Sequence, residues 1–87
     1  MDTPPAPAFP CDYPLKLMGR RTPEFRERML GVLTLHAARA PLLETGERLS
    51  RDGSYVSLTV TLRIETRSDL ERIYRDLQAT GLVLYAL

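Results

Sequence analysis

The sequence predicts an α+β fold in which four strands and two helices follow one another as strand, helix, strand, strand, helix, strand. The clearest strand, residues 55–64, alternates between apolar and other side chains, as a strand with one buried face does. Two helical segments, residues 22–40 and 66–80, each carry one apolar stripe. All three apolar surfaces are buried if both helices pack on one side of an antiparallel sheet. We therefore expect a ferredoxin-like sandwich: a four-stranded antiparallel sheet with two helices on one face and the other face open.

The N-terminal segment is expected to be a flexible, extended arm. Residues 1–11 contain four prolines and a single charge, Asp2, and proline removes a backbone hydrogen-bond donor. Such an arm can also act as a polyproline ligand, but this one lacks a basic anchor. We place a single folded domain at residues 12–87, a length that supports only a modest core.

The first strand and first helix are predicted from local patterns. Leu15 and Leu17 alternate with their neighbours over residues 13–19, which indicates a half-buried strand. Thr22-Pro23-Glu24 is typical of a helix start, with a capping hydroxyl, a proline in the first turn and an acid near the positive end. Apolar and aromatic residues then recur at helical spacing until Pro41: Phe25, Met29, Val32, Leu33 and His36.

The next two strands are expected to form a hairpin. Residues 42–50 fit an edge strand, although Glu47 puts a charge on the face of Leu43 and Leu49, so the register there stays open. Asp52-Gly53 favours a tight turn. The strand of residues 55–64 then turns one set of side chains to the helices, namely Val56, Leu58, Val60, Leu62 and Ile64. The other set faces away: Tyr55, Ser57, Thr59, Thr61 and Arg63.

The second helix has two candidate caps. Ser68 and Glu71 fit a capping box, and Thr66 is an alternative cap two residues earlier. Thr80-Gly81 should end this helix, and the apolar run of residues 82–87 has the length of a final strand.

Several segments, in this order, resemble the YbeD-like family of small bacterial proteins. They are Lys16-Leu17-Met18-Gly19, Thr22-Pro23-Glu24-Phe25, His36-Ala37, residues 53–61 and residues 70–74. The resemblance covers about residues 12–87 and implies a fold similar to ACT domains, which are small-molecule-sensing modules attached to metabolic enzymes. The resemblance identifies no catalytic or binding residues, because none has been agreed for the family. Glu47 departs from the family pattern, which is apolar at that position.

The motifs of catalysis are missing from the sequence. His36 is the single histidine and Cys11 the single cysteine, and there is no phosphate loop, zinc-ligand pairing or hydrolase elbow. We expect no enzyme, no cofactor and no metal. His36 is expected to be a partly buried structural side chain, with pH sensing or metal ligation as alternatives, and Cys11 a bystander thiol.

The turn that leads into the first helix is the first candidate site. Gly19, Arg20, Arg21 and Thr22 combine free backbone N–H groups with two guanidinium groups, which suit a carboxylate or phosphate. In ACT domains the corresponding turn often borders the ligand, and Gly19 resembles the glycine found there. The alternative is that Gly19 merely relieves a tight turn and both arginines are solvated.

The open face of the sheet is the second candidate, as an interface made by Met18, Tyr55, Ser57, Thr59 and Thr61. A second copy could cover this face, or a strand could pair with a sheet edge, and a plain solvated face is the alternative. RNA is less favoured, because one ring at Tyr55 is no stacking platform and the net charge is only +1. No apolar run approaches the roughly 18 residues of a membrane span, so we expect a cytoplasmic protein without a membrane partner.

These observations predict a regulatory or adaptor module that binds a small anionic metabolite or a protein partner and that self-associates. An RNA-binding module is the alternative, and a minimal enzyme that depends on His36 or Tyr55 is the third class. The ligand, the partner, the oligomeric state and the role of the arm are left open by the sequence.

Overall fold

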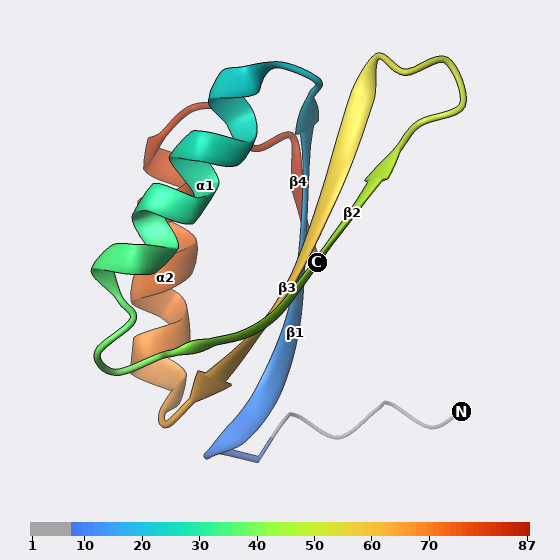
Figure 1. The fold of residues 1–87 in the computed structure, drawn as a ribbon. Helices are drawn as coiled ribbons and strands as arrows, with labels where there is room; N and C mark the ends of the chain where they lie inside the picture. The colour runs from blue at the N-terminus through green and yellow to red at the C-terminus, as the bar shows by residue number, and fades with distance from the viewer. Residues whose placement is uncertain (1–7) are drawn as a thin grey trace, which may run out of the picture.

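The computed structural model describes residues 8–87, and within them the six predicted elements follow in the predicted order (Figure 1). The elements are β1 (Cys11–Arg20), α1 (Pro23–Leu35), β2 (Leu42–Leu49), β3 (Tyr55–Ile64), α2 (Arg67–Ala79) and β4 (Tyr85–Ala86). The strands pair antiparallel in the order β2-β3-β1-β4. Both helices cover one face of this sheet, and the other face is open (Figure 1). The predicted ferredoxin-like architecture is confirmed.

The core lies between the helices and the two central strands. Leu15 pairs with Val60 and Leu17 with Leu58 across β1 and β3, and all four side chains are buried. The helices contribute buried side chains from their apolar stripes: Phe25, Met29, Leu33, Leu70, Ile73 and Leu77. The side chains of β3 therefore alternate as predicted, with the apolar set facing the helices.

The two helices begin at threonines. Thr22 has an extended backbone and its hydroxyl accepts a hydrogen bond from the N–H of Phe25 at 3.2 Å, as predicted. The prediction that Ser68 and Glu71 form a capping box is wrong. The alternative cap, Thr66, begins α2 by accepting a hydrogen bond from the N–H of Asp69 at 3.2 Å. Starting the helix at Arg67 places Asp69 in its first turn, where a carboxylate is favoured by the helix dipole.

The ends of β1 and β4 differ from the prediction. β1 begins at Cys11, which was assigned to the arm, and it continues through Gly19 to Arg20. Residues 1–7 of the predicted arm lie outside the described residues. The final strand is shortened to Tyr85–Ala86, although Leu84 and Leu87 also donate backbone N–H groups to β1, at 2.8 and 2.9 Å. No helix in the described part of the chain has the length and apolar character needed to cross a bilayer.

β2 is an edge strand, as predicted, and its register is now defined. Glu47 lies opposite Leu58, so its side chain is on the helix side of the sheet. There it forms an ion pair with Arg26 of α1 at 3.3 Å, with both side chains about half exposed. A bulge between Leu42 and Glu44 shifts the pairing at the start of the strand.

Candidate functional site

A cleft of about 590 Å³ opens between the N-terminus of α1 and the β2–β3 hairpin. Residues at its wall include Arg21, Thr22, Arg26, Glu47, Gly53 and Ser54. The hairpin and the helix start are joined there, because the N–H of Arg21 donates to the carbonyl of Ser54 at 2.9 Å. The cleft therefore has a fixed backbone frame on both sides.

The structure divides the predicted ligand-binding turn. Arg21 and Thr22 line the cleft, whereas Gly19 and Arg20 belong to β1 and do not. Arg20 is paired with Tyr55, which places it on the open face of the sheet. Two of the four predicted residues are thus brought together at the cleft, and binding by any of them stays a prediction.

Gly19 is needed for packing rather than for a turn. It lies inside β1 opposite Val56, and its φ is not in the left-handed region. A Cβ atom on Gly19 would lie 2.2 and 2.4 Å from two ring carbons of Phe25 and 2.8 Å from the carbonyl oxygen of Leu82. The interpretation that this glycine relieves a tight turn is therefore wrong.

The charged side chains around the cleft differ in whether they have an ion-pair partner. Arg26 is paired with Glu47 at 3.3 Å, and Glu24 is paired with Arg28 at 3.4 Å. Arg21 has no acidic partner within 4.0 Å among residues 8–87. The helix dipole makes this end of α1 positive, although Pro23 has no N–H and the N–H of Phe25 already donates to the hydroxyl of Thr22. The site can therefore neutralise one small anionic group.

The five predicted interface residues do share the open face. Met18 pairs with Ser57, and Thr59 and Thr61 follow in register on β3. Tyr55 is 39% exposed. The sequence analysis missed Tyr85, which lies opposite Met18 and is 67% exposed. The apolar run of residues 82–87 does not alternate, so only the pairing with β1 reveals which side chains face outward.

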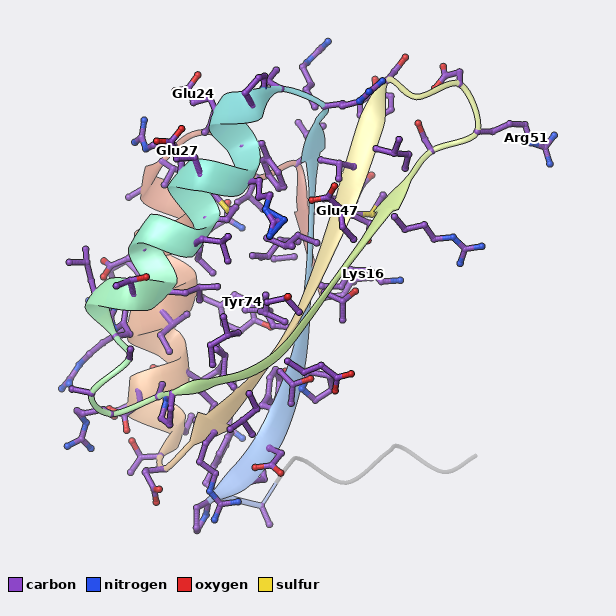
Figure 2. The ribbon with its side chains drawn as sticks, in the orientation of Figure 1. Lys16, Glu24, Glu27, Glu47, Arg51 and Tyr74 are labelled. Atoms are coloured by element: carbon purple, nitrogen blue, oxygen red, sulfur yellow. The ribbon has the colours of Figure 1, made fainter. Side chains whose placement is uncertain are left out.

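Basic side chains also gather on this open face. Lys16, Arg20 and Arg48 lie opposite Thr59, Tyr55 and Ser57 respectively. None of the three has an acidic partner within 4.0 Å among the described residues. Glu24 and Glu27 project from α1 on the other side of the molecule (Figure 2). Two acids share this face, Glu44 opposite Thr61 and Asp12 paired with Arg63, so the face keeps an excess of positive charge.

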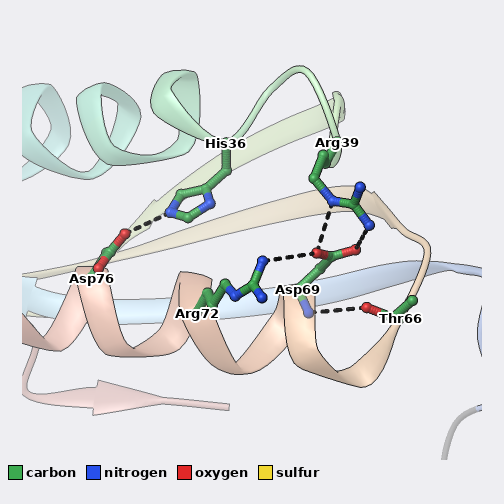
Figure 3. Close-up of polar contacts among 6 residues, drawn as sticks. All are labelled: His36, Arg39, Thr66, Asp69, Arg72 and Asp76. Atoms are coloured by element: carbon green, nitrogen blue, oxygen red, sulfur yellow. Dashed lines mark hydrogen bonds and ion pairs between the residues drawn. The ribbon is translucent and has the colours of Figure 1, made fainter.

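A polar cluster joins the two helices at the opposite end from the cleft (Figure 3). The buried Asp69 accepts two hydrogen bonds from Arg39, both at 3.0 Å, and these hold the pKa of Asp69 below its usual range. Arg72 adds a weaker contact at 3.9 Å. His36 follows the last turn of α1, and its Nε2 is 2.7 Å from a carboxylate oxygen of Asp76. These contacts fix the helix pair.

Metal ligands are not grouped in the described part of the chain. Within residues 8–87 no three His, Cys, Asp or Glu side chains come close enough together to hold a metal ion. Cys11 is a half-buried free thiol of β1.

The sheet order, the helix layer and the open face define a small ferredoxin-like domain of the ACT-like type. Two solved structures share this fold. The C-terminal domain of the MgtC protein from Mycobacterium tuberculosis matches 94% of this chain and 89% of its own, with a TM-score of 0.72 and 16% identity. Protein HP0495 from H. pylori matches 95% of this chain and 87% of its own, with a TM-score of 0.68 and 18% identity.

The chain belongs to the family described as "Protein of unknown function (DUF493)", whose model matches residues 5–87. A UPF0250 protein of Neisseria meningitidis serogroup C is 38% identical over 79 residues, which cover 91% of this chain and 87% of the relative. A UPF0250 protein of Paraburkholderia phytofirmans is also 38% identical, over 91% of this chain and 89% of its own. The resemblance to the YbeD-like family is confirmed.

Proposed function

We propose that this protein is a non-enzymatic regulatory or adaptor module of the bacterial cytoplasm that binds a small anionic metabolite in the cleft beside α1. The observation that carries the proposal is the position of Arg21. Its guanidinium has no acidic partner among residues 8–87 and borders a cleft of about 590 Å³ at the positive end of a helix. Ligand sites of small molecules typically have volumes of about 300–1,000 Å³.

The wall of the cleft limits the ligand to one small anionic group. Arg26 is already engaged by Glu47, so Arg21, which lies at the positive end of the α1 dipole, supplies the free positive charge. A multiply charged ligand would meet Glu47 across the cleft. A single carboxylate on a compact body fits this balance, and amino acids and hydroxy acids belong to that class, whereas a phosphate monoester carries nearly two charges at pH 7 and fits less well.

A thermal-shift screen of carboxylates, amino acids and phosphate monoesters tests the proposal. A ligand present at 100 times its Kd stabilises a protein by about 2.7 kcal/mol, which corresponds to a rise in Tm of roughly 10–20 °C for a domain of this size. The Arg21→Ala variant should lose the shift. The control is Arg75→Ala, because Arg75 is an exposed arginine of α2 remote from the cleft.

Two results would contradict a cleft ligand: no compound raises the Tm, or a raised Tm persists unchanged in Arg21→Ala. The adaptor part of the proposal is tested separately, by pull-down from a bacterial lysate. A partner retained by the wild-type protein and by Arg75→Ala, but not by Arg21→Ala, would place protein recognition at the same cleft.

The open face favours a second candidate, binding of single-stranded RNA. Tyr55 and Tyr85 offer two exposed rings, and Lys16, Arg20 and Arg48 offer unpaired cations on the same face. Bases stack on such rings, and phosphates bind such cations with an affinity that falls as salt rises. Binding to a labelled oligonucleotide should weaken in Arg20→Ala and Tyr85→Ala. Absence of binding at low ionic strength would remove this candidate.

A further inference from the structure

β2 presents a long free edge. All eight of its residues are exposed, and among residues 8–87 its only neighbour in the sheet is β3. Three leucines lie exposed along it, with 39%, 52% and 47% of Leu42, Leu43 and Leu49 accessible. Free edges carry unpaired N–H and C=O groups and readily accept another strand. Exposed leucines on such an edge indicate that it is covered in the assembled protein.

The orientation of the backbone identifies the groups that are available. The N–H of Ser50 donates to Tyr55 of β3 at 2.9 Å, and strand residues point their backbone groups alternately to the two sides. Arg48 and Gly46 lie two and four residues before Ser50, so their backbone groups point the same way and bond to β3. The N–H and C=O groups of Thr45, Glu47 and Leu49 point to the free edge.

We infer that the strand that pairs with this edge is β2 of a second copy, antiparallel and with Gly46 opposite Gly46 of the partner subunit. In this register Glu44 lies opposite Arg48 of the partner subunit, and the two-fold axis repeats the pair. Both residues face the open side of the sheet, and neither has an ion-pair partner among residues 8–87 of its own chain. Opposite charges placed directly across antiparallel strands stabilise the pairing.

The rest of the strand is also self-complementary in this register. By the same count Leu43, which lies at the bulge and has no partner on β3, comes opposite Leu49 of the partner subunit, again twice, so exposed leucine meets exposed leucine. Thr45 comes opposite Glu47, whose charge is already matched by Arg26 of its own chain. The outward N–H and C=O groups of Thr45 and Glu47 then bond across the edge. The helices of both copies lie on the same side of one eight-stranded sheet.

Neighbouring registers lack these matches. Centring the pairing on Thr45 puts Arg48 opposite Leu42 and leaves Glu44 opposite Gly46. Centring it on Glu47 puts Arg48 opposite Gly46 and Glu44 opposite Ser50, so the pair of opposite charges is lost again. A copy stacked on the open face is also disfavoured, because Lys16, Arg20 and Arg48 outnumber the unpaired Glu44 there and would confront a second set of cations. The edge is the surface on which a second copy is complementary.

Charge reversal tests the pairing of Glu44 with Arg48. By analytical ultracentrifugation the wild-type protein should dimerise, and Arg48→Glu or Glu44→Arg should each raise the dissociation constant at least tenfold. The double variant Glu44→Arg/Arg48→Glu should restore dimerisation, because it exchanges the two charges without removing the pair. Arg51→Glu is the control, since Arg51 lies in the hairpin turn beyond the strand, and it should leave the dimer unchanged.

A disulfide across the two-fold axis tests the register. In a non-hydrogen-bonded antiparallel pair the Cα atoms are about 4.5 Å apart, within the range of about 4.4–6.8 Å that a disulfide spans. A Cβ on Gly46 meets no atom within 4 Å, and neither does one on Gly31 of α1. In a Cys11→Ser background, Gly46→Cys should oxidise to a covalent dimer, whereas Gly31→Cys should stay monomeric on a denaturing gel.

Several outcomes would overturn the inference. A wild-type protein that is monomeric up to about 1 mM, where even weak pairing is populated, is one. A double variant that stays monomeric, or a Gly31→Cys variant that cross-links as readily as Gly46→Cys, is another. The inference is independent of the proposed ligand, because Arg21→Ala should abolish ligand binding and leave the dissociation constant of the dimer unchanged.

Discussion

Replacing Gly19 by alanine should destabilise the protein strongly, because the helix layer leaves no room for a methyl group there. The added Cβ would lie 2.2 Å from a ring carbon of Phe25, whereas carbon atoms in contact are normally about 3.5–4.0 Å apart. The ring must therefore move by more than about 1 Å. Phe25 is only 1% exposed, and the backbone carbonyl of Leu82 closes the other side at 2.8 Å.

The magnitude follows from the cost of overfilling a packed core. Such insertions typically cost about 1–3 kcal/mol, and a contact with both a buried ring and a backbone atom belongs at the upper end. A loss of about 3 kcal/mol lowers the Tm of a domain this size by roughly 10–20 °C. This loss outweighs the gain of about 0.5–1 kcal/mol that alanine normally brings over glycine inside a strand.

Urea unfolding followed by circular dichroism measures the effect. Gly31→Ala is the matched control, because the same methyl group on α1 meets nothing within 4 Å and should raise the free energy of unfolding by about 1 kcal/mol. In Gly19→Ala/Phe25→Leu the losses should be less than additive, since the clashing ring is gone. If Gly19→Ala were as stable as the wild-type protein, the close packing of Phe25 on β1 would be refuted.

Three further predictions concern the caps and the buried titratable groups. Thr66→Ala should cost about 1 kcal/mol in urea unfolding and Ser68→Ala almost nothing; the reverse order would contradict the cap assignment. Arg39 holds the pKa of Asp69 below its unfolded value of about 3.9, so the stability it contributes is present above pH 4 and lost on acidification. Asp69→Asn should therefore be less stable at pH 7 and lose less stability between pH 5 and 2. Burial raises the pKa of Tyr74 above its unfolded value of about 10, so stability should fall above pH 10, and less so in Tyr74→Phe.

The elements that sequence reasoning predicted correctly are those with a local signal. The alternation of β3 and the cap at Thr22 are properties of consecutive residues, and the structure reproduces both. The start of α2 has no such unique signal, because Thr66 and Ser68 are both good caps. Asp69 is in contact with Arg39, thirty residues away in sequence, and that contact fits a helix that is capped by Thr66. A contact between residues so far apart in sequence leaves no local pattern from which it could be predicted.

The candidate sites depended on register, which is a property of strand pairs. Arg20 was grouped with Arg21 because they are adjacent in sequence, yet the end of β1 falls between them and sends them to different surfaces. Tyr85 was missed for a related reason. A run of apolar residues has no period, so the partner strand alone decides which face each residue takes.

Glu47 shows most directly why an apparent departure from a pattern is informative. Alternation placed it on the face of the core, where an unpaired carboxylate is costly, and that conflict left the register of the strand open. On an edge strand the inward face is only half covered, so the carboxylate stays half exposed and reaches Arg26 at 3.3 Å. The pair neutralises Arg26 at the cleft and leaves Glu47 without an uncompensated charge at the edge of the sheet. Because Glu47 pairs with Arg26, Arg21 is left as the unpaired cation among the cleft residues of the described chain. The same pairing is compatible with a second copy at the edge.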